Sequence, residues 1–100
     1  MAVGMLLSIP GFTQEHYEQV NQKLWGHYPM EPADAPSGLI LHSAGPAPDG
    51  WYVYDIWETR EDFQRFAEER VGPAMQSVVG DAAGGPPVPD FYEVASVVKV

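Results

Sequence analysis

The sequence predicts an α+β fold in which a four-stranded antiparallel sheet packs against two helical segments. Four apolar runs of strand length alternate with two stretches that repeat apolar residues at helical spacing. Their order is strand, helix, strand, strand, helix, strand. The two central strands are joined by a short Gly/Pro/Asp turn, which makes them antiparallel neighbours. This order is the ferredoxin-like, or split βαβ, pattern.

The length predicts one domain that covers residues 1–100. A chain of this size buries about 60–70 % of the surface that its unfolded form exposes. That burial supports one hydrophobic core and excludes two independent ones.

The first two elements are a strand at residues 2–9 and a helix from about Gln14 to Trp25. The strand is short, apolar and ended by Pro10-Gly11, which favours a buried strand over a helix. Thr13 is a good helix N-cap. The apolar stripe of this helix consists of Tyr17, Val20 and Leu24.

Residues 26–37 form a loop, because they are rich in Pro and Ala and have no periodicity. A loop of this length is often a lid or a binding loop, although a plain connection is commoner. His27, Tyr28 and Met30 make it unusually apolar. We therefore expect it to lie against the body of the protein or against a partner subunit.

A hairpin at residues 38–58 is the centre of the predicted fold. If the turn at residues 45–50 closes symmetrically, His42 faces Tyr54 on one side of the sheet, and Asp55 lies on the other. Both sides are mostly aliphatic or aromatic, whereas an antiparallel hairpin with one wet side alternates apolar and polar residues. The helices can cover one side only, so a second copy of the protein is expected to cover the other.

A second helix follows the hairpin and is capped by Thr59. Gly72-Pro73 is expected to interrupt this helix and to start a further segment at Ala74 to Val79. Residues 81–90 form a Gly/Pro linker, and Phe91 to Val100 is the last strand. The buried stripe of the second helix consists of Phe63, Phe66, Ala67 and Val71.

Composition excludes several classes of function. The formal charge is −9, from 14 acidic and 5 basic residues, and such a field repels nucleic acid and anionic lipid. Cysteine is absent, so no disulfide, thiolate nucleophile or zinc-thiolate site is available. The first apolar run is far shorter than the ~20 residues that span a bilayer. We expect a cytoplasmic protein without nucleic-acid or membrane partners.

The passage Asp-Ile-Trp-Glu-Thr-Arg-Glu-Asp-Phe, from Asp55 to Phe63, marks the junction between the third strand and the second helix. Together with the element order and the length, it resembles the dimeric α/β-barrel superfamily, in particular antibiotic-biosynthesis-monooxygenase-like (ABM-like) domains. The resemblance covers essentially the whole chain. It implies a homodimer with sheets face to face and a pocket between helices and sheet. Members include cofactor-free oxygenases, haem-degrading monooxygenases and isomerases.

The haem-degrading branch of this superfamily does not match the sequence. Those enzymes have an Asn in the first strand, a Trp in the second helix and a His ligand at the end of that helix. The corresponding residues here are Ser8, Phe66 and about Gln76. An amide is a poor iron ligand, and the His residues lack metal-site spacing. We therefore expect no metal, haem or other cofactor.

The candidate catalytic residues are His42, Tyr54 and Asp55. Histidine titrates near neutrality and suits a general base, and a neighbouring tyrosine can donate to a substrate oxygen. Two structural alternatives stay open. His42 and Tyr54 can simply bond each other inside the core. Asp55 can form a salt bridge with Arg60, Arg65, Arg70 or Lys99, which we weigh above a catalytic role.

The expected ligand is a small hydrophobic molecule, aromatic or polyketide-like, held in the pocket by stacking side chains. The residues assigned to this surface are Trp25, Tyr52, Trp57, Phe63 and Phe66. The predicted function is cofactor-independent monooxygenation or isomerisation of that molecule. The alternative is a dimeric module that binds a ligand without turnover or serves only a structural role, since fold alone does not determine function.

Overall fold

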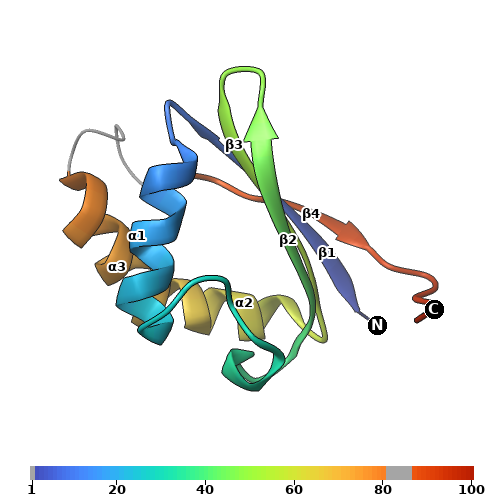
Figure 1. The fold of residues 1–100 in the computed structure, drawn as a ribbon. Helices are drawn as coiled ribbons and strands as arrows, with labels where there is room; N and C mark the ends of the chain where they lie inside the picture. Colours follow the sequence, from blue (N-terminus) through green and yellow to red (C-terminus); the bar gives the residue numbers. More distant parts are fainter. Residues whose placement is uncertain (1, 81–86) are drawn as a thin grey trace.

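The computed structural model describes residues 2–80 and 87–100, and it forms a sheet with all of its helices on one face (Figure 1). The sheet is four-stranded and antiparallel, with strand order β2-β3-β1-β4, as the ferredoxin-like pattern predicts. The strands and helices are β1 (Val3–Pro10), α1 (Gln14–Trp25), β2 (Leu39–Ala47), β3 (Gly50–Trp57), α2 (Arg60–Phe66), α3 (Gly72–Val79) and β4 (Asp90–Glu93).

Helix α1 has the predicted bounds because both of its ends are capped by local chemistry. The Thr13 hydroxyl accepts a hydrogen bond from the His16 backbone N–H, and the His16 ring accepts one from the Thr13 N–H. This reciprocal arrangement satisfies two backbone donors at the start of the helix. Gly26 ends the helix with a φ of 82°, a conformation that glycine adopts without strain.

The second helical region is continuous through Gly72-Pro73, where the sequence predicted an interruption. The residues Ala67–Val71 form a π-helical turn between α2 and α3. In this turn the Gly72 N–H donates to the carbonyl of Ala67, five residues earlier. Pro73 has no N–H to donate to a helical hydrogen bond. The wider π-helical turn before it allows the helix to continue, and Pro73 lies in the first turn of α3.

From Leu41 to Ala47 the register of the β2–β3 hairpin differs from the predicted one by a single residue, and a β-bulge between Leu39 and Leu41 restores the predicted register at Leu39, which pairs with Trp57. Ala47 pairs with Gly50 across a turn of Pro48 and Asp49, and His42 pairs with Asp55. The predicted pairing of His42 with Tyr54 is therefore wrong, because the strands close one position later than a symmetric turn at residues 45–50 requires. A shift of one residue moves every side chain to the opposite face of the sheet.

This register gives the sheet two faces of different character. The face toward the helices, here called the helix face, holds four buried or half-buried side chains of β3, namely Trp51, Val53, Asp55 and Trp57. The other face, here called the open face, holds Leu41 from β2, Tyr52, Tyr54 and Ile56 from β3, and Tyr92 from β4.

Strand β4 is shorter than the predicted strand Phe91 to Val100, which is wrong beyond Glu93. β4 runs antiparallel to β1 and pairs with it only as far as Val3 opposite Glu93. Residues after Val94 extend past the start of β1 and have no partner strand within the described part of the chain. Of the predicted linker at residues 81–90, positions 81–86 lie outside the described residues.

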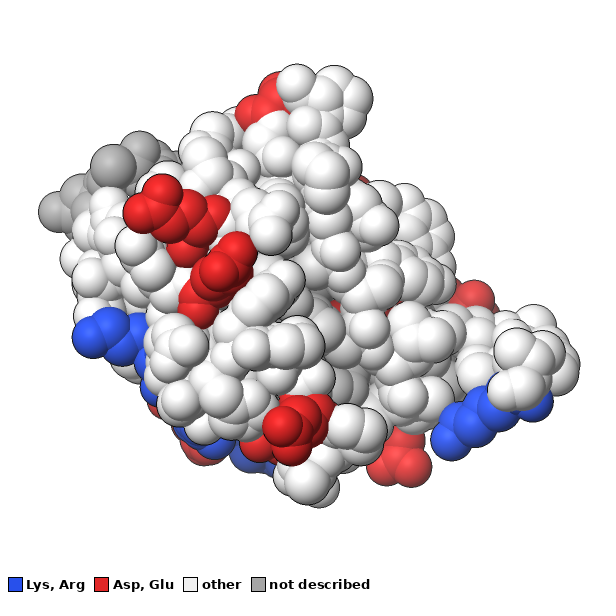
Figure 2. All heavy atoms as spheres, in the orientation of Figure 1, with Lys and Arg blue, Asp and Glu red and all other residues white. Residues whose placement is uncertain are grey.

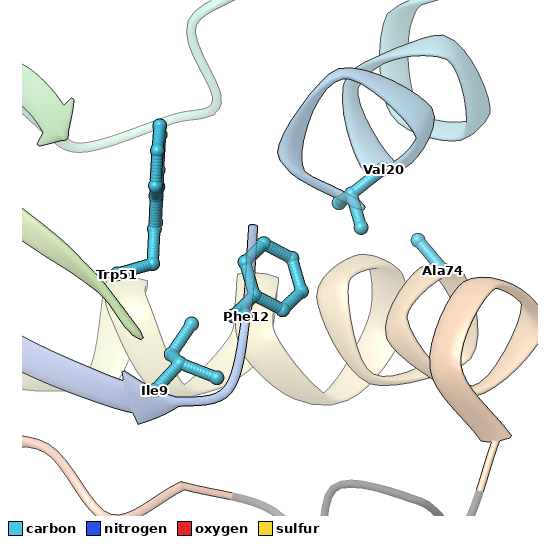
Figure 3. Close-up of a cluster of buried hydrophobic side chains, with 5 residues drawn as sticks. All are labelled: Ile9, Phe12, Val20, Trp51 and Ala74. Carbon is cyan, nitrogen blue, oxygen red and sulfur yellow. The ribbon is translucent and has the colours of Figure 1, made fainter. Parts of the chain in front are cut away.

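The buried core joins the end of β1 and the start of β3 to α1 and α3 (Figure 3). Ile9, Phe12 and Trp51 come from the sheet and the turn after β1, and Val20 and Ala74 come from the two helices. Figure 3 shows these side chains pointing toward one another between the layers. This packing fixes the position of α1 relative to the sheet. It thereby also fixes the distance between Tyr17 of α1 and the residues of β2 and β3.

Charged side chains do not gather into one patch on the face shown in Figure 2. Acidic groups lie at separate places, with broad uncharged areas between them. This distribution agrees with an acidity carried by solvated surfaces. Within residues 2–80 and 87–100, no helix is long and apolar enough to cross a membrane.

Candidate functional site

A cavity of about 540 Å³ lies between the helices and the helix face of the sheet. One wall is aliphatic and comes from β1, with Met5, Leu7 and Ile9. The other wall is aromatic. It consists of Trp25 of α1, Trp57 of β3, and Phe63 and Phe66 of α2.

The aromatic wall is internally packed, with Phe66 at its centre. The Trp25 and Phe66 rings are stacked with centroids 5.9 Å apart, and Trp57 lies 5.7 Å from Phe66 and 5.8 Å from Phe63. Aromatic pairs at such separations are favourable beyond the area that they bury. Trp25 and Phe66 are nearly parallel, whereas the Trp57 ring is inclined to both Phe63 and Phe66 and is fully buried behind them. The wall is therefore a preformed aromatic surface that Trp57 supports from behind.

Few polar side chains reach this cavity. Among the described lining residues they are Tyr17, Asn21, His42, Asp55 and Gln76, and no Lys or Arg is present. Ligand sites are typically apolar spaces with a small number of converging polar groups.

Tyr17, His42, Asp55 and Trp57 form one hydrogen-bonded set, here called the polar cluster. The Tyr17 hydroxyl lies 2.5 Å from Nε2 of His42, and Nδ1 of the same ring lies 2.7 Å from Oδ1 of Asp55. The Trp57 indole N–H donates to Oδ2 of Asp55 at 3.2 Å. The cluster joins α1, β2 and β3 within the wall of the cavity.

The donor and acceptor roles in the polar cluster follow from the chemistry of its members. A carboxylate only accepts, so the hydrogen between His42 and Asp55 belongs to Nδ1 of the imidazole. In the neutral ring Nε2 is then an acceptor, and the Tyr17 hydroxyl donates to it. Asp55 thus fixes the tautomer in which Nε2 of His42 is the hydrogen-bond acceptor on the side of Tyr17.

Tyr17 is held in place by its aromatic neighbours. Its ring centroid lies 5.1 Å from that of Trp51 and 6.0 Å from that of Tyr28, which meets it edge-on. Burial raises the pKa of Tyr17, a nearby hydrogen bond from Asn21 works in the opposite direction, and the Asp55 charge adds to the increase. A phenol with the ordinary pKa of 10.0 is already protonated near neutral pH, and the upward shift favours this form, which donates to His42.

Two of the predicted site residues lie on the wrong side of the sheet. Tyr54 and Tyr52 belong to the open face, so the prediction that Tyr54 assists His42 and the prediction that Tyr52 stacks on a ligand in this cavity are both wrong. The cause is the one-residue difference in hairpin register. The other predicted residues line the cavity: His42, Asp55, Trp25, Trp57, Phe63 and Phe66.

Asp55 has a different partner from the expected one. It pairs with His42, and no ion pair among the described residues joins it to Arg or Lys. Three of the four candidate cations have other contacts. Arg60 lies over the Phe91 ring, Arg65 approaches Asp62, and Arg70 donates to the Leu24 carbonyl at the end of α1.

Tyr17 is the site residue that sequence reasoning missed. Its spacing with Val20 and Leu24 placed it on the buried stripe of α1, where it does lie. One signal was available, because a buried tyrosine hydroxyl usually has a hydrogen-bond partner. The sequence could not name that partner, since it depends on how α1 packs across the sheet.

The loop at residues 26–37 covers one side of the cavity. Met30 and Pro36 line it, and the loop is braced by a contact of 2.9 Å between Nε2 of His27 and the Asp34 carboxylate. A second cavity of about 350 Å³ lies against the loop and shares Met30, Leu39 and His42 with the first. The loop therefore lies against the body of the protein, as its apolar composition predicts.

The residues present do not fit a haem group. His42 is the one histidine that lines the main cavity in the described part of the chain, and both of its ring nitrogens are bonded within the polar cluster. Gln76 and Phe66, which the sequence resemblance put at the expected ligand and tryptophan positions, both line this cavity, and neither side chain is a suitable iron ligand. Nor do the described residues contain a group of three or more His, Cys, Asp or Glu side chains that could hold a metal ion.

Comparison with solved structures identifies the fold. A candidate antibiotic biosynthesis monooxygenase from Nitrosomonas europaea superposes with a TM-score of 0.57 at 17% identity, covering 96% of this chain and all of that one. The chain has the ABM-like fold. A second ABM-like structure, a candidate antibiotic biosynthesis monooxygenase from Deinococcus radiodurans, matches with a TM-score of 0.55 at 15% identity, covering 100% of this chain and 98% of that one. No protein-family model and no curated sequence matches this chain.

Proposed function

We propose that this ABM-like domain binds an uncharged, hydrophobic aromatic or polyketide-like molecule in the main cavity and oxidises or isomerises it. His42 is the general base of the reaction, and Asp55 orients it. The protein's own side chains supply this chemistry, with no bound cofactor. The observation that carries the proposal is the short hydrogen-bond path from Tyr17 through His42 to Asp55 in the cavity wall.

The shape and chemistry of the cavity support this class of ligand. Its volume of about 540 Å³ lies within the range of about 300–1,000 Å³ that is common for small-molecule sites. The aromatic wall offers stacking surface to a planar ring. The polar cluster lies in the wall of the same cavity, so a bound ring and the base are close together.

Removing a proton from such a ligand prepares it for either reaction. The resulting anion is electron-rich, so it can pass electrons to dioxygen, or it can take back a proton at another position and become an isomer. A positioned base contributes about 10²–10⁴-fold to the rate of a proton-transfer step.

Ligand binding without turnover is the second candidate function. It is favoured by the fact that both ring nitrogens of His42 are already bonded to protein groups. In this case the polar cluster serves to stabilise the sheet and α1, and the cavity only stores a molecule.

We also propose that the protein works as a homodimer, with the open faces of two sheets in contact. Leu41 and Tyr92 on this face are 44% and 54% exposed in the single chain, and Tyr52, Tyr54 and Ile56 are half-buried. An apolar surface of this kind is unfavourable in water and matches itself across a twofold axis.

Native mass spectrometry of freshly expressed protein tests the ligand class and the dimer together. We expect a mass of two subunits and a co-purified hydrophobic molecule. That molecule, or a panel of hydroxylated two- and three-ring aromatics, is then supplied while oxygen uptake and product formation are followed.

The residue test is His42→Ala, with Tyr54→Phe as the matched control on the open face. Turnover is expected to be abolished by the first variant and retained by the second. Turnover at the wild-type rate in His42→Ala removes His42 from the mechanism. Binding of the ligand without any product in the wild type supports the second candidate function instead.

A further inference from the structure

We propose that Tyr17 is the catalytic residue that contacts the ligand, and that it passes the proton of an acidic ligand hydroxyl on to His42. The site then takes uncharged phenols or enols, and it discriminates against carboxylates and against ethers of the same shape. This inference rests on the proposed function, because it uses the same base and the same cavity.

The occupied ring nitrogens of His42 are the first step of the argument. Nδ1 is hydrogen-bonded to Asp55 and Nε2 to Tyr17. A ligand can therefore transfer a proton to His42 only by displacing Tyr17 or by passing the proton through the Tyr17 hydroxyl. Displacement is unfavourable, because the Tyr17 ring is packed between Trp51 and Tyr28. A path through the Tyr17 oxygen requires no movement of the ring.

The Tyr17 hydroxyl has the free capacity that such a path needs. A phenol has one donor and two acceptor positions, and the donor is engaged with His42. The side-chain hydrogen bond from Asn21 that lowers the pKa of Tyr17 uses one acceptor position, so the second can accept a hydrogen bond from a ligand hydroxyl. Tyr17 and its partner His42 both line the main cavity. The proposal requires that the oxygen which joins them is reached from this space.

The proton transfer balances within the polar cluster. The O–H bond of the ligand breaks as a new O–H bond forms on Tyr17, and the original Tyr17 O–H bond breaks as an N–H bond forms on Nε2 of His42. The ligand becomes an oxyanion and His42 becomes an imidazolium beside the Asp55 carboxylate. The net charge in the cavity does not change, which avoids the cost of bringing an unpaired charge into an apolar space.

The charges around the cavity select the form in which the ligand enters. No Lys or Arg lines the cavity among the described residues, while Asp55 does. A carboxylate or phosphate would lose its hydration without meeting a cation and would be repelled by Asp55. A neutral hydroxyl compound enters without losing the hydration of a charge and without repulsion by Asp55. It becomes an anion only when its proton is transferred, at the moment when His42 becomes a cation.

Binding of 4-nitrophenol tests the inference, because its ionised form has a visible absorbance distinct from that of the neutral form. Two molecules of similar shape serve as ligand controls: 4-nitroanisole, which has no acidic proton, and 4-nitrobenzoate, which carries a charge. Tryptophan fluorescence measures binding, and absorbance measures the ionised fraction at fixed pH. We expect the wild type to bind the phenol at least tenfold more tightly than the benzoate and to raise its ionised fraction.

Three variants separate Tyr17 from His42. Tyr17→Phe keeps the ring and removes the oxygen, His42→Gln removes the base, and Tyr54→Phe removes the same hydroxyl from the open face. We expect the wild type to bind the phenol more tightly than 4-nitroanisole, and we expect Tyr17→Phe and His42→Gln to lose this preference, with the ionised fraction of the phenol reduced to that of the free probe. Tyr54→Phe should behave as the wild type does. Thermal unfolding of each variant confirms that it is folded.

The outcomes distinguish the two proposals. Ionisation in Tyr17→Phe that equals or exceeds the wild-type value overturns the relay through Tyr17 and indicates direct contact with His42. Ionisation that survives in His42→Gln overturns the proposed function itself. A wild type that binds the phenol without ionising it overturns the relay and supports ligand binding without turnover.

Discussion

The two faces of the β2–β3 hairpin contain similar amino acids in different environments. On the helix face, His42 and Asp55 meet Tyr17 and Trp57 in a hydrogen-bonded cluster beside a cavity. On the open face, tyrosines of the same strand lie half-buried, with aliphatic residues around them. The position of a polar residue relative to the turn therefore decides whether it belongs to a site or to a surface.

The largest expected contrast between the faces is in stability. Trp57 on the helix face is fully buried and supports Phe63, Phe66 and Asp55. Trp57→Ala should lower the free energy of unfolding by about 3–5 kcal/mol. Tyr92→Ala, at a residue that is 54% exposed on the open face, should cost less than about 1 kcal/mol in the isolated subunit. Urea denaturation measures both, and equal losses would contradict the division between the faces.

The second contrast concerns assembly. Ile56→Glu places a carboxylate on the open face of each subunit, so like charges meet across the proposed dimer. We expect the dissociation constant to rise by about 100-fold, which corresponds to about 2.7 kcal/mol. Gln19→Glu adds the same charge at an exposed position of α1 and should leave the dimer intact. Sedimentation velocity reports both, and a wild type that sediments as a single subunit at micromolar concentration would rule out the dimer.

The third contrast concerns the carboxylate of Asp55. Asp55→Asn keeps the size of the side chain, but His42 and Trp57 donate to different oxygens of Asp55, and the amide replaces one of these oxygens by an NH2 donor, so one of the two donors loses its acceptor. The expected cost is about 1–3 kcal/mol in stability, together with loss of phenol ionisation by the cavity. Asp49→Asn at the exposed hairpin turn is the control and should change neither. Unchanged ionisation in Asp55→Asn would show that His42 does not depend on Asp55 for its orientation.

The smallest expected effect is a pH dependence that belongs to Tyr17. Its pKa is raised above the ordinary value of 10.0, chiefly by burial, so the folded protein favours the neutral phenol. This contribution to stability is complete below about pH 10 and is lost as the pH rises through the folded-state pKa. The free energy of unfolding should thus fall more steeply above pH 10 in the wild type than in Tyr17→Phe. Parallel curves for the two proteins would mean that Tyr17 titrates as an exposed tyrosine does.

Much of the fold is predictable from local sequence signals. Thr13 and Gly26 fix the two ends of α1, and the order of apolar runs gives the four strands and their topology. These features depend on residues close together in the chain. The last strand was predicted to run to Val100 but ends at Glu93. Its β-branched residues indicate extended chain whether or not a partner strand is available.

The site is only partly predictable. His42 and Asp55 were recognisable because each is polar within an apolar strand, but their partnership depended on a hairpin register that composition does not fix to one residue. Tyr17 was recognisable as a core residue and not as a partner of His42. That contact joins α1 to β2, and it follows from the packing of Val20 and Phe12 rather than from any local pattern.

Nitrogen-15 NMR of the histidine rings tests the polar cluster most directly. In the neutral ring of His42 we expect the hydrogen on Nδ1, an unprotonated Nε2, and a slowly exchanging Nδ1 proton that disappears in Asp55→Asn. His16 and His27, which lie at the surface side of the fold, provide internal references. A His42 ring with its hydrogen on Nε2, or one whose signals do not change in Asp55→Asn, would contradict the arrangement on which both proposals rest.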